Sequence, residues 1–108
     1  MRHKVSITHL AFFRWKHDLS NRELQAIHQG FAALQSLVPE IRSFRWIHNN
    51  STEGLDRGFR EGICMEFDSL QARQRYLEHP SHVAFAQSTV IPALEHGLES
   101  VMVFDYEE

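Results

Sequence analysis

The sequence has one cysteine, no cluster of basic residues and no apolar run long enough to cross a bilayer. Cys64 has no partner for a disulfide, which excludes a disulfide-stabilised scaffold and fits a reducing compartment. No apolar run approaches the ~18 residues that a membrane-spanning helix needs. The first residues alternate polar and apolar side chains instead of forming the core of a signal peptide. We therefore expect a cytoplasmic protein with no membrane partner.

The sequence also has no strong excess of charge of either sign. The 11 Lys and Arg residues are outnumbered by 14 Asp and Glu residues, and the arginines are scattered between acids. Nucleic acid is bound mainly by clustered Lys and Arg, so it is not an expected partner. The sequence also lacks a Gly-rich phosphate loop and a serine flanked by glycines. We expect no cofactor.

A metal site deserves separate consideration because the chain has eight histidines. The closest pair, His79 and His82, is interrupted by Pro80. Zinc sites usually place histidines three to five intervening residues apart and often include a cysteine pair, which this chain lacks. We expect no metal.

The length of 108 residues fits one domain, which we expect to span residues 1–108. A chain of this size buries somewhat over ~60% of its extended surface, so a partner subunit would help to stabilise it. Hydrophobic periodicity predicts strands over 4–15, 41–48, 59–67 and 99–106, and helices over 20–38, 69–77 and 81–90. Ser20 and Glu23 have the spacing of a capping box, and residues 49–58 read as a connector between strands.

This order predicts an α+β fold of the ferredoxin-like βαββαβ type, with a four-stranded antiparallel sheet and helices on one face. The other face of the sheet would remain apolar, because Leu10 and Phe12 alternate with Ile7 and Phe13 on the first strand. One set of the two would face water as an apolar patch. A second copy packed sheet to sheet would cover it, so we expect a homodimer.

The segment from Tyr76 to His82 concentrates a phenol and two imidazoles at a bend imposed by Pro80. Imidazole suits proton transfer near neutral pH, and a tyrosine hydroxyl can hydrogen-bond an oxyanion. The alternative is structural: His79 would cap the end of a helix, and His82 would cap or pack. His9, in the middle of the first strand, is either a hydrogen-bonded core histidine or part of a cavity.

Taken in order, these features resemble the stress-responsive A/B barrel family, also called the dimeric α/β-barrel domain. The residues that carry the resemblance are His9, Ser20, Val38-Pro39, Asn49, Ser51, Glu53-Gly54, Gly58-Phe59, Phe67-Asp68-Ser69, Tyr76, His79-Pro80-Ser81-His82, Phe85 and Asp105-Tyr106. The resemblance implies a dimeric ferredoxin-like barrel.

A plant cyclase of this family closes a linear polyketide-derived chain by an intramolecular aldol step. The second histidine of its His-Pro-x-His segment is the base, and an upstream tyrosine assists. By resemblance, these catalytic roles fall on His82 and Tyr76, with His9 in the same pocket. Substrate contacts are expected from Phe85, His79 and Glu61.

Glu61 departs from the family pattern, since many relatives have a histidine at this point of the third strand. Its negative charge would repel a carboxylated or poly-oxo substrate. Two functions stay open. One is a cyclase- or isomerase-like enzyme that removes a proton next to a carbonyl, with His82 as base, Tyr76 as oxyanion donor and His9 as orienter. The other is a non-catalytic homodimer that binds a small hydrophobic or poly-oxo ligand or acts in a stress response.

Overall fold

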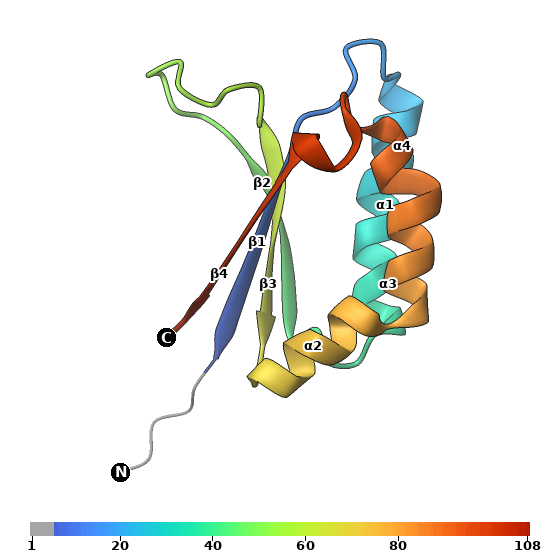
Figure 1. Cartoon of the computed structure of the whole chain (residues 1–108), viewed down its shortest axis with the longest axis vertical. Coiled ribbons are helices and arrows are strands. Elements are labelled where there is room, and N and C mark those ends of the chain that lie inside the picture. The colour runs from blue at the N-terminus through green and yellow to red at the C-terminus, as the bar shows by residue number, and fades with distance from the viewer. Residues whose placement is uncertain (1–5) are drawn as a thin grey trace.

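The structure is a computed structural model that describes residues 6–108. Four strands form one antiparallel sheet in the order β2-β3-β1-β4, and the helices cover one face of it (Figure 1). The elements are β1 (Ile7–Phe13), α1 (Asn21–Leu37), β2 (Ser43–His48), β3 (Glu61–Phe67), α2 (Leu70–Glu78), α3 (Pro80–Phe85), the π-helical η1 (Ala86–Val90), α4 (Ile91–Ala93), the 3-10 helix η2 (Gly97–Ser100) and β4 (Val101–Glu107). The predicted ferredoxin-like fold is confirmed.

Helix α1 begins where the sequence predicts. The Ser20 hydroxyl accepts a hydrogen bond from the Glu23 N–H at 3.1 Å, and the Glu23 carboxylate accepts one from the Ser20 N–H at 3.2 Å. Each side chain thus satisfies a backbone donor that the first turn leaves free. The buried stripe of the helix is formed by Ile27, Phe31 and Leu34.

The core lies between the helices and one face of the sheet. On β1 the side chains of Ile7, His9, Ala11 and Phe13 are buried, while Leu10 and Phe12 on the opposite face are only half buried. Strand β3 pairs with β1 and adds its own inner-face residues to the core, namely Ile63, Met65 and Phe67. The set that contains Ile7 and Phe13 is therefore the one that meets the helices.

The strands are shorter than predicted. β1 ends at Phe13, because Trp15 forms only an isolated bridge to Leu94, and residues 4 and 5 of the predicted strand lie outside the described part. The prediction that the last strand begins at residue 99 is wrong. Gly97 has a φ of 60°, and it starts the turn η2 that delays β4 to Val101.

The last helical segment extends further than predicted. A proline inside a helix lacks an N–H and clashes with the preceding turn, which is why the sequence predicts that the helix over 81–90 stops near Pro92. Instead α3 continues through η1 into α4, which ends at Ala93. The wider turn of η1, closed by the Ile91 N–H on the Ala86 carbonyl, accommodates Pro92 in the first turn of α4.

Within residues 6–108, no helix is both long and apolar enough to cross a membrane.

Candidate functional site

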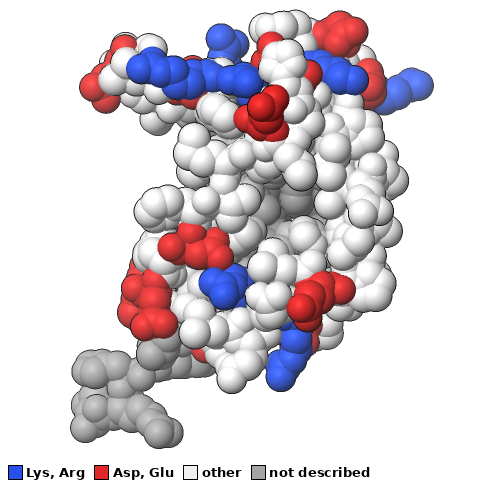
Figure 2. All heavy atoms as spheres, in the orientation of Figure 1, with Lys and Arg blue, Asp and Glu red and all other residues white. Residues whose placement is uncertain are grey.

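A cavity of about 260 Å³ lies between the inner face of the sheet and the helices α2, α3 and η1. We call it the main cavity. Figure 2 shows a hollow on this side of the molecule, where most of the visible surface belongs to residues other than Lys, Arg, Asp and Glu. The residues that line the main cavity are His9, Ala11, Phe13, Phe31, Ile63, Tyr76, Leu77, His82, Phe85, Ala86, Val90, Ile91, Leu94, Leu98, Val101, Val103 and Asp105.

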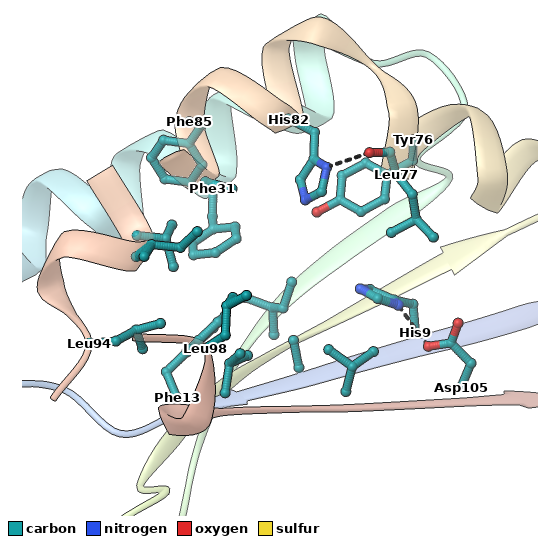
Figure 3. A pocket seen from close by; sticks show the side chains of 17 residues that line it. His9, Phe13, Phe31, Tyr76, Leu77, His82, Phe85, Leu94, Leu98 and Asp105 are labelled. Atoms are coloured by element: carbon teal, nitrogen blue, oxygen red, sulfur yellow. Dashed lines mark hydrogen bonds and ion pairs between the residues drawn. The ribbon is translucent and has the colours of Figure 1, made fainter. Parts of the chain in front are cut away.

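The polar groups of the main cavity gather at one end. His9 from β1, Tyr76 from α2, His82 from α3 and Asp105 from β4 lie there, whereas Phe13 and Leu94 lie at the other end (Figure 3). Leu98 and Val103 line the cavity and remain more than half exposed, at 69% and 56%, so they form its opening. The site therefore combines a polar end with a long apolar wall.

The bend between α2 and α3 brings Tyr76 and His82 together. His79 precedes Pro80 and has an extended backbone, with φ −63° and ψ 132°, as expected for a residue before proline. The centres of the Tyr76 and His82 rings are 4.3 Å apart, with the ring planes tilted by 38°. Separate helices, rather than one continuous helix, thus place the two rings in contact.

Hydrogen bonding fixes the proton on the His82 ring. His82 Nδ1 lies 3.1 Å from the Leu77 carbonyl oxygen. A carbonyl can only accept, so Nδ1 carries the hydrogen and Nε2 keeps a free lone pair. Burial lowers the pKa of His82 from its usual value of 6.5; the hydrogen bond to Leu77 opposes this effect, and nearby His9 and His79 add to it. Neutral His82 therefore offers Nε2 as a base at neutral pH.

Tyr76 is almost fully buried, with 1% of its surface exposed. Burial raises the pKa of Tyr76 well above its usual value, because the phenolate would lose its hydration. The hydroxyl consequently stays protonated at neutral pH and can donate a hydrogen bond. Figure 3 shows it directed towards the space between His82 and His9.

His9 is held by a carboxylate that we did not single out from the sequence as a site residue. His9 and Asp105 are direct cross-strand partners, and His9 Nδ1 lies 2.7 Å from Asp105 Oδ1. The other oxygen of Asp105 accepts a hydrogen bond from Arg73 Nη1 at 3.1 Å. Because the carboxylate accepts at Nδ1, the lone pair of His9 is on Nε2. Only the strand register, which sequence periodicity does not give, could have paired the two residues.

Of the three predicted substrate contacts, one lies in the lining of the main cavity and two do not. Phe85 lines the main cavity and packs edge to face against Phe31, with ring centres 4.9 Å apart. His79 is not among the lining residues. Its Nδ1 accepts a hydrogen bond from the Ser81 N–H at 3.1 Å, so the side chain caps the start of α3, whereas the structural alternative placed it at the end of a helix.

Glu61 also lies outside the lining of the main cavity, at the start of β3. Its carboxylate accepts hydrogen bonds from the indole nitrogens of Trp15 at 2.9 Å and Trp46 at 3.0 Å. His28 Nε2 and His48 Nδ1 lie 3.6 Å and 3.4 Å from the same carboxylate. The carboxylate is thus occupied by side chains of this chain and is not directed at a ligand in the main cavity.

In the part of the chain that the structure describes, no group of three or more His, Cys, Asp or Glu side chains is arranged to hold a metal ion.

A comparison with known protein families shows to which of them this chain belongs. The model of the stress-responsive A/B barrel domain matches residues 7–108, almost the whole sequence. The chain belongs to this family. The predicted resemblance is thereby confirmed.

Two proteins are similar to this chain over almost their whole length. The stress-response A/B barrel domain-containing protein HS1 of Arabidopsis thaliana is 29% identical over 104 residues, covering 96% of this chain and 91% of that protein. Olivetolic acid cyclase of Cannabis sativa is 20% identical over 102 residues, covering 94% of this chain and 96% of the cyclase.

Solved structures show the same fold. A hydroxynitrile lyase from Passiflora edulis superposes with a TM-score of 0.81 at 25% identity, covering 95% of this chain and 93% of the lyase. A dimeric ferredoxin-like protein of unknown function from a Jannaschia species superposes with a TM-score of 0.80 at 19% identity, covering 94% of this chain and 97% of that one. At this identity the second likeness shows the fold alone.

Proposed function

We propose that the main cavity binds a small uncharged molecule with an apolar body and a carbonyl group, and that the protein removes a proton from the carbon next to that carbonyl. The described residues that line the cavity include no Lys or Arg. Asp105, the acidic lining residue, is already engaged by His9 and Arg73. A charged head group would find no opposite charge there, and its burial would be costly. A ligand without net charge fits this cavity best.

His82 is the proposed base. Its Nε2 takes the proton from the C–H bond, the electron pair of that bond forms a carbon–carbon double bond, and the π electron pair of the carbonyl moves to oxygen to give an enolate. The Tyr76 hydroxyl donates a hydrogen bond to this oxygen, where the negative charge develops. The contact between a neutral imidazole and a protonated phenol is the single observation that carries the proposal.

His9 is proposed to orient the ligand. Its Nδ1–H is fixed by Asp105, so Nε2 can accept a hydrogen bond from a hydroxyl of the ligand. The His9 and Tyr76 rings are 5.8 Å apart at an angle of 67°, which places the two groups on adjacent sides of the polar end. A cyclase- or isomerase-like reaction follows from these roles. Two similar proteins are a cyclase and a hydroxynitrile lyase, which supports an enzymatic role.

The protein is also proposed to act as a homodimer through the sheet face opposite the helices. On β4, the residues Met102, Phe104 and Tyr106 are 49%, 60% and 43% exposed. They lie beside Leu10 and Phe12 of the neighbouring strand, since Phe104 pairs with Leu10 and Met102 with Phe12. An apolar surface of this kind favours association. The ferredoxin-like protein from the Jannaschia species, which has the same fold, is dimeric. A stable monomer at micromolar concentration in sedimentation would contradict this part of the proposal.

Deuterium exchange tests the reaction without knowledge of the natural substrate. Phenylacetone is small and apolar, and its methylene group is acidic because it lies between a ring and a carbonyl. In deuterated buffer, the protein should accelerate loss of the methylene proton signal in NMR, and His82→Ala should remove the acceleration. Binding without accelerated exchange would instead favour the alternative, a homodimer that binds a small ligand without turnover.

A further inference from the structure

Both tryptophans of the chain are hydrogen-bonded to one buried carboxylate. Trp15 follows β1 and Trp46 lies on β2, and each indole donates to a different oxygen of Glu61 on β3. The Glu61 side chain is only 9% exposed. Hydrogen bonds from neutral donors to a desolvated carboxylate are strong and fix the orientation of both rings. We call this arrangement the indole clamp.

The indole clamp supports Phe13. The Phe13 ring stacks on Trp15 with centres 4.8 Å apart and an angle of 22°, and lies parallel to Trp46 at 6.5 Å and 18°. Phe13 is 3% exposed and belongs to the core. The ring is held by the two indoles together with Phe31, whose ring centre lies 5.5 Å away.

Phe13 contributes to the walls of two cavities. It lines the main cavity, and it also lines a second cavity of about 350 Å³ that includes Trp15, His48, Glu61 and Glu95. In the main cavity Phe13 lies at the end opposite His9, Tyr76 and Asp105 (Figure 3). A ligand whose polar group meets His82 and Tyr76 can therefore direct its apolar body towards Phe13.

We propose that Glu61 is a positioning residue that sets the greatest ligand length, because its clamp on Trp15 and Trp46 holds Phe13 as the end wall of the main cavity. This inference rests on the proposed function, since it takes the polar end of the main cavity as the site of the ligand's head group. Without the clamp, Phe13 can turn aside and the main cavity opens into the second one. Longer apolar ligands then fit.

The clamp itself is tested without any ligand, by acrylamide quenching of tryptophan fluorescence. In Glu61→Gln the side-chain oxygen still accepts from one indole, but the amide nitrogen cannot accept from the other. Quenching should rise in Glu61→Gln and rise further in Glu61→Ala. Glu95→Gln is the matched control, because Glu95 lines the same second cavity but pairs with Arg14 at 2.9 Å instead of an indole. Unchanged quenching in the Glu61 variants would overturn the clamp.

The length limit is tested by calorimetric titration with para-alkylphenols, from para-cresol to para-octylphenol. Affinity should rise about fourfold for each methylene that stays buried. In the wild-type protein and in Glu95→Gln it should then fall at one chain length, and in Glu61→Ala that length should shift upwards by several methylenes. An identical limit in the wild type and both Glu61 variants would overturn the inference.

The two proposals fail in distinguishable ways. If no alkylphenol binds the wild-type protein, the length limit fails, whereas deuterium exchange of phenylacetone still decides the proposed function and quenching still decides whether the clamp exists. If alkylphenols bind but the limit does not move, only the inference about Glu61 fails. Circular dichroism checks that each variant is folded. If Glu61→Ala does not fold, both the quenching and the titration are done with Glu61→Gln.

Discussion

His9 and Asp105 face each other across the pairing of β1 with β4, and their side chains meet at 2.7 Å between Nδ1 and Oδ1. This contact decides which nitrogen of His9 faces the main cavity. It joins the middle of the first strand to the end of the last, so the polar end of the cavity exists only when the sheet is complete.

Asp105→Asn should weaken both the fold and the orientation of His9. The amide carries no charge, so the hydrogen bonds to His9 and Arg73 lose their ionic character, which we expect to cost ~1.5–3 kcal/mol of unfolding free energy. The amide can also present its NH₂ group to Nδ1, which would move the imidazole hydrogen to Nε2. Urea unfolding measures the first effect and long-range ¹H–¹⁵N correlation of the His9 ring the second. Glu107→Gln, at an exposed position two residues further along β4, is the control and should change neither.

Three variants of the bend separate catalysis from packing. His82→Ala should reduce the exchange rate of a bound ketone by ~10²–10⁴-fold, since it removes the base. Tyr76→Phe should remove one donor to the oxyanion, a loss of ~2.7–4 kcal/mol in transition-state stabilisation. His79→Ala should leave the exchange rate nearly unchanged and lower the thermal midpoint, because the side chain caps α3. If His82→Ala and His79→Ala differ from the wild type only in stability, the catalytic role is wrong.

Stability should depend on pH through His82. The pKa of His82 is lower in the folded protein than its ordinary value of 6.5, so the unfolded chain binds protons more readily. The stability that neutral His82 contributes is therefore fully present above the unfolded pKa and is lost as the pH falls through the folded one. His82→Gln should flatten this part of the curve. Unfolding free energies measured between roughly pH 5 and 8 in both proteins give the comparison; parallel curves would show that other groups cause the dependence.

Gly30→Ala should weaken ligand binding while leaving stability nearly unchanged. A Cβ at Gly30 would lie 2.2 Å from the Cε1 atom of Phe85, so the Phe85 ring must move, and the adjacent open space is the main cavity. The strain is offset by the better helix propensity of alanine, worth ~1 kcal/mol. Titration with para-propylphenol should show lower affinity in the variant, with a thermal midpoint close to that of the wild type. Unchanged affinity would mean that Phe85 moves away from the cavity instead.

Much of the fold could be predicted because its signals are local. The capping box at Ser20 and the extended backbone forced on His79 by Pro80 depend on a few adjacent residues, and both are present. The end of the last helix was harder, since the π turn η1 that accommodates Pro92 has no comparable sequence signature.

The site could be predicted only in part, because several of its contacts join residues that are far apart in the sequence. His82 and Tyr76 are close in sequence and lie in contact, and family resemblance added His9 and Phe85, which also line the cavity. The engagement of His9 by Asp105 depends on strand register. The occupation of Glu61 by two indoles depends on β2, β3 and the segment after β1 coming together, and nothing local in the sequence indicates it.

The most direct test of the central claim is a crystal structure of the protein soaked with phenylacetone. The claim is that the polar end of the main cavity receives a carbonyl. We predict the ketone oxygen within hydrogen-bond distance of the Tyr76 hydroxyl, the acidic methylene facing His82 Nε2, and the phenyl ring directed towards Phe13. A ligand bound elsewhere, or bound with its ring against His82 and its oxygen at the opening near Leu98, would contradict the claim.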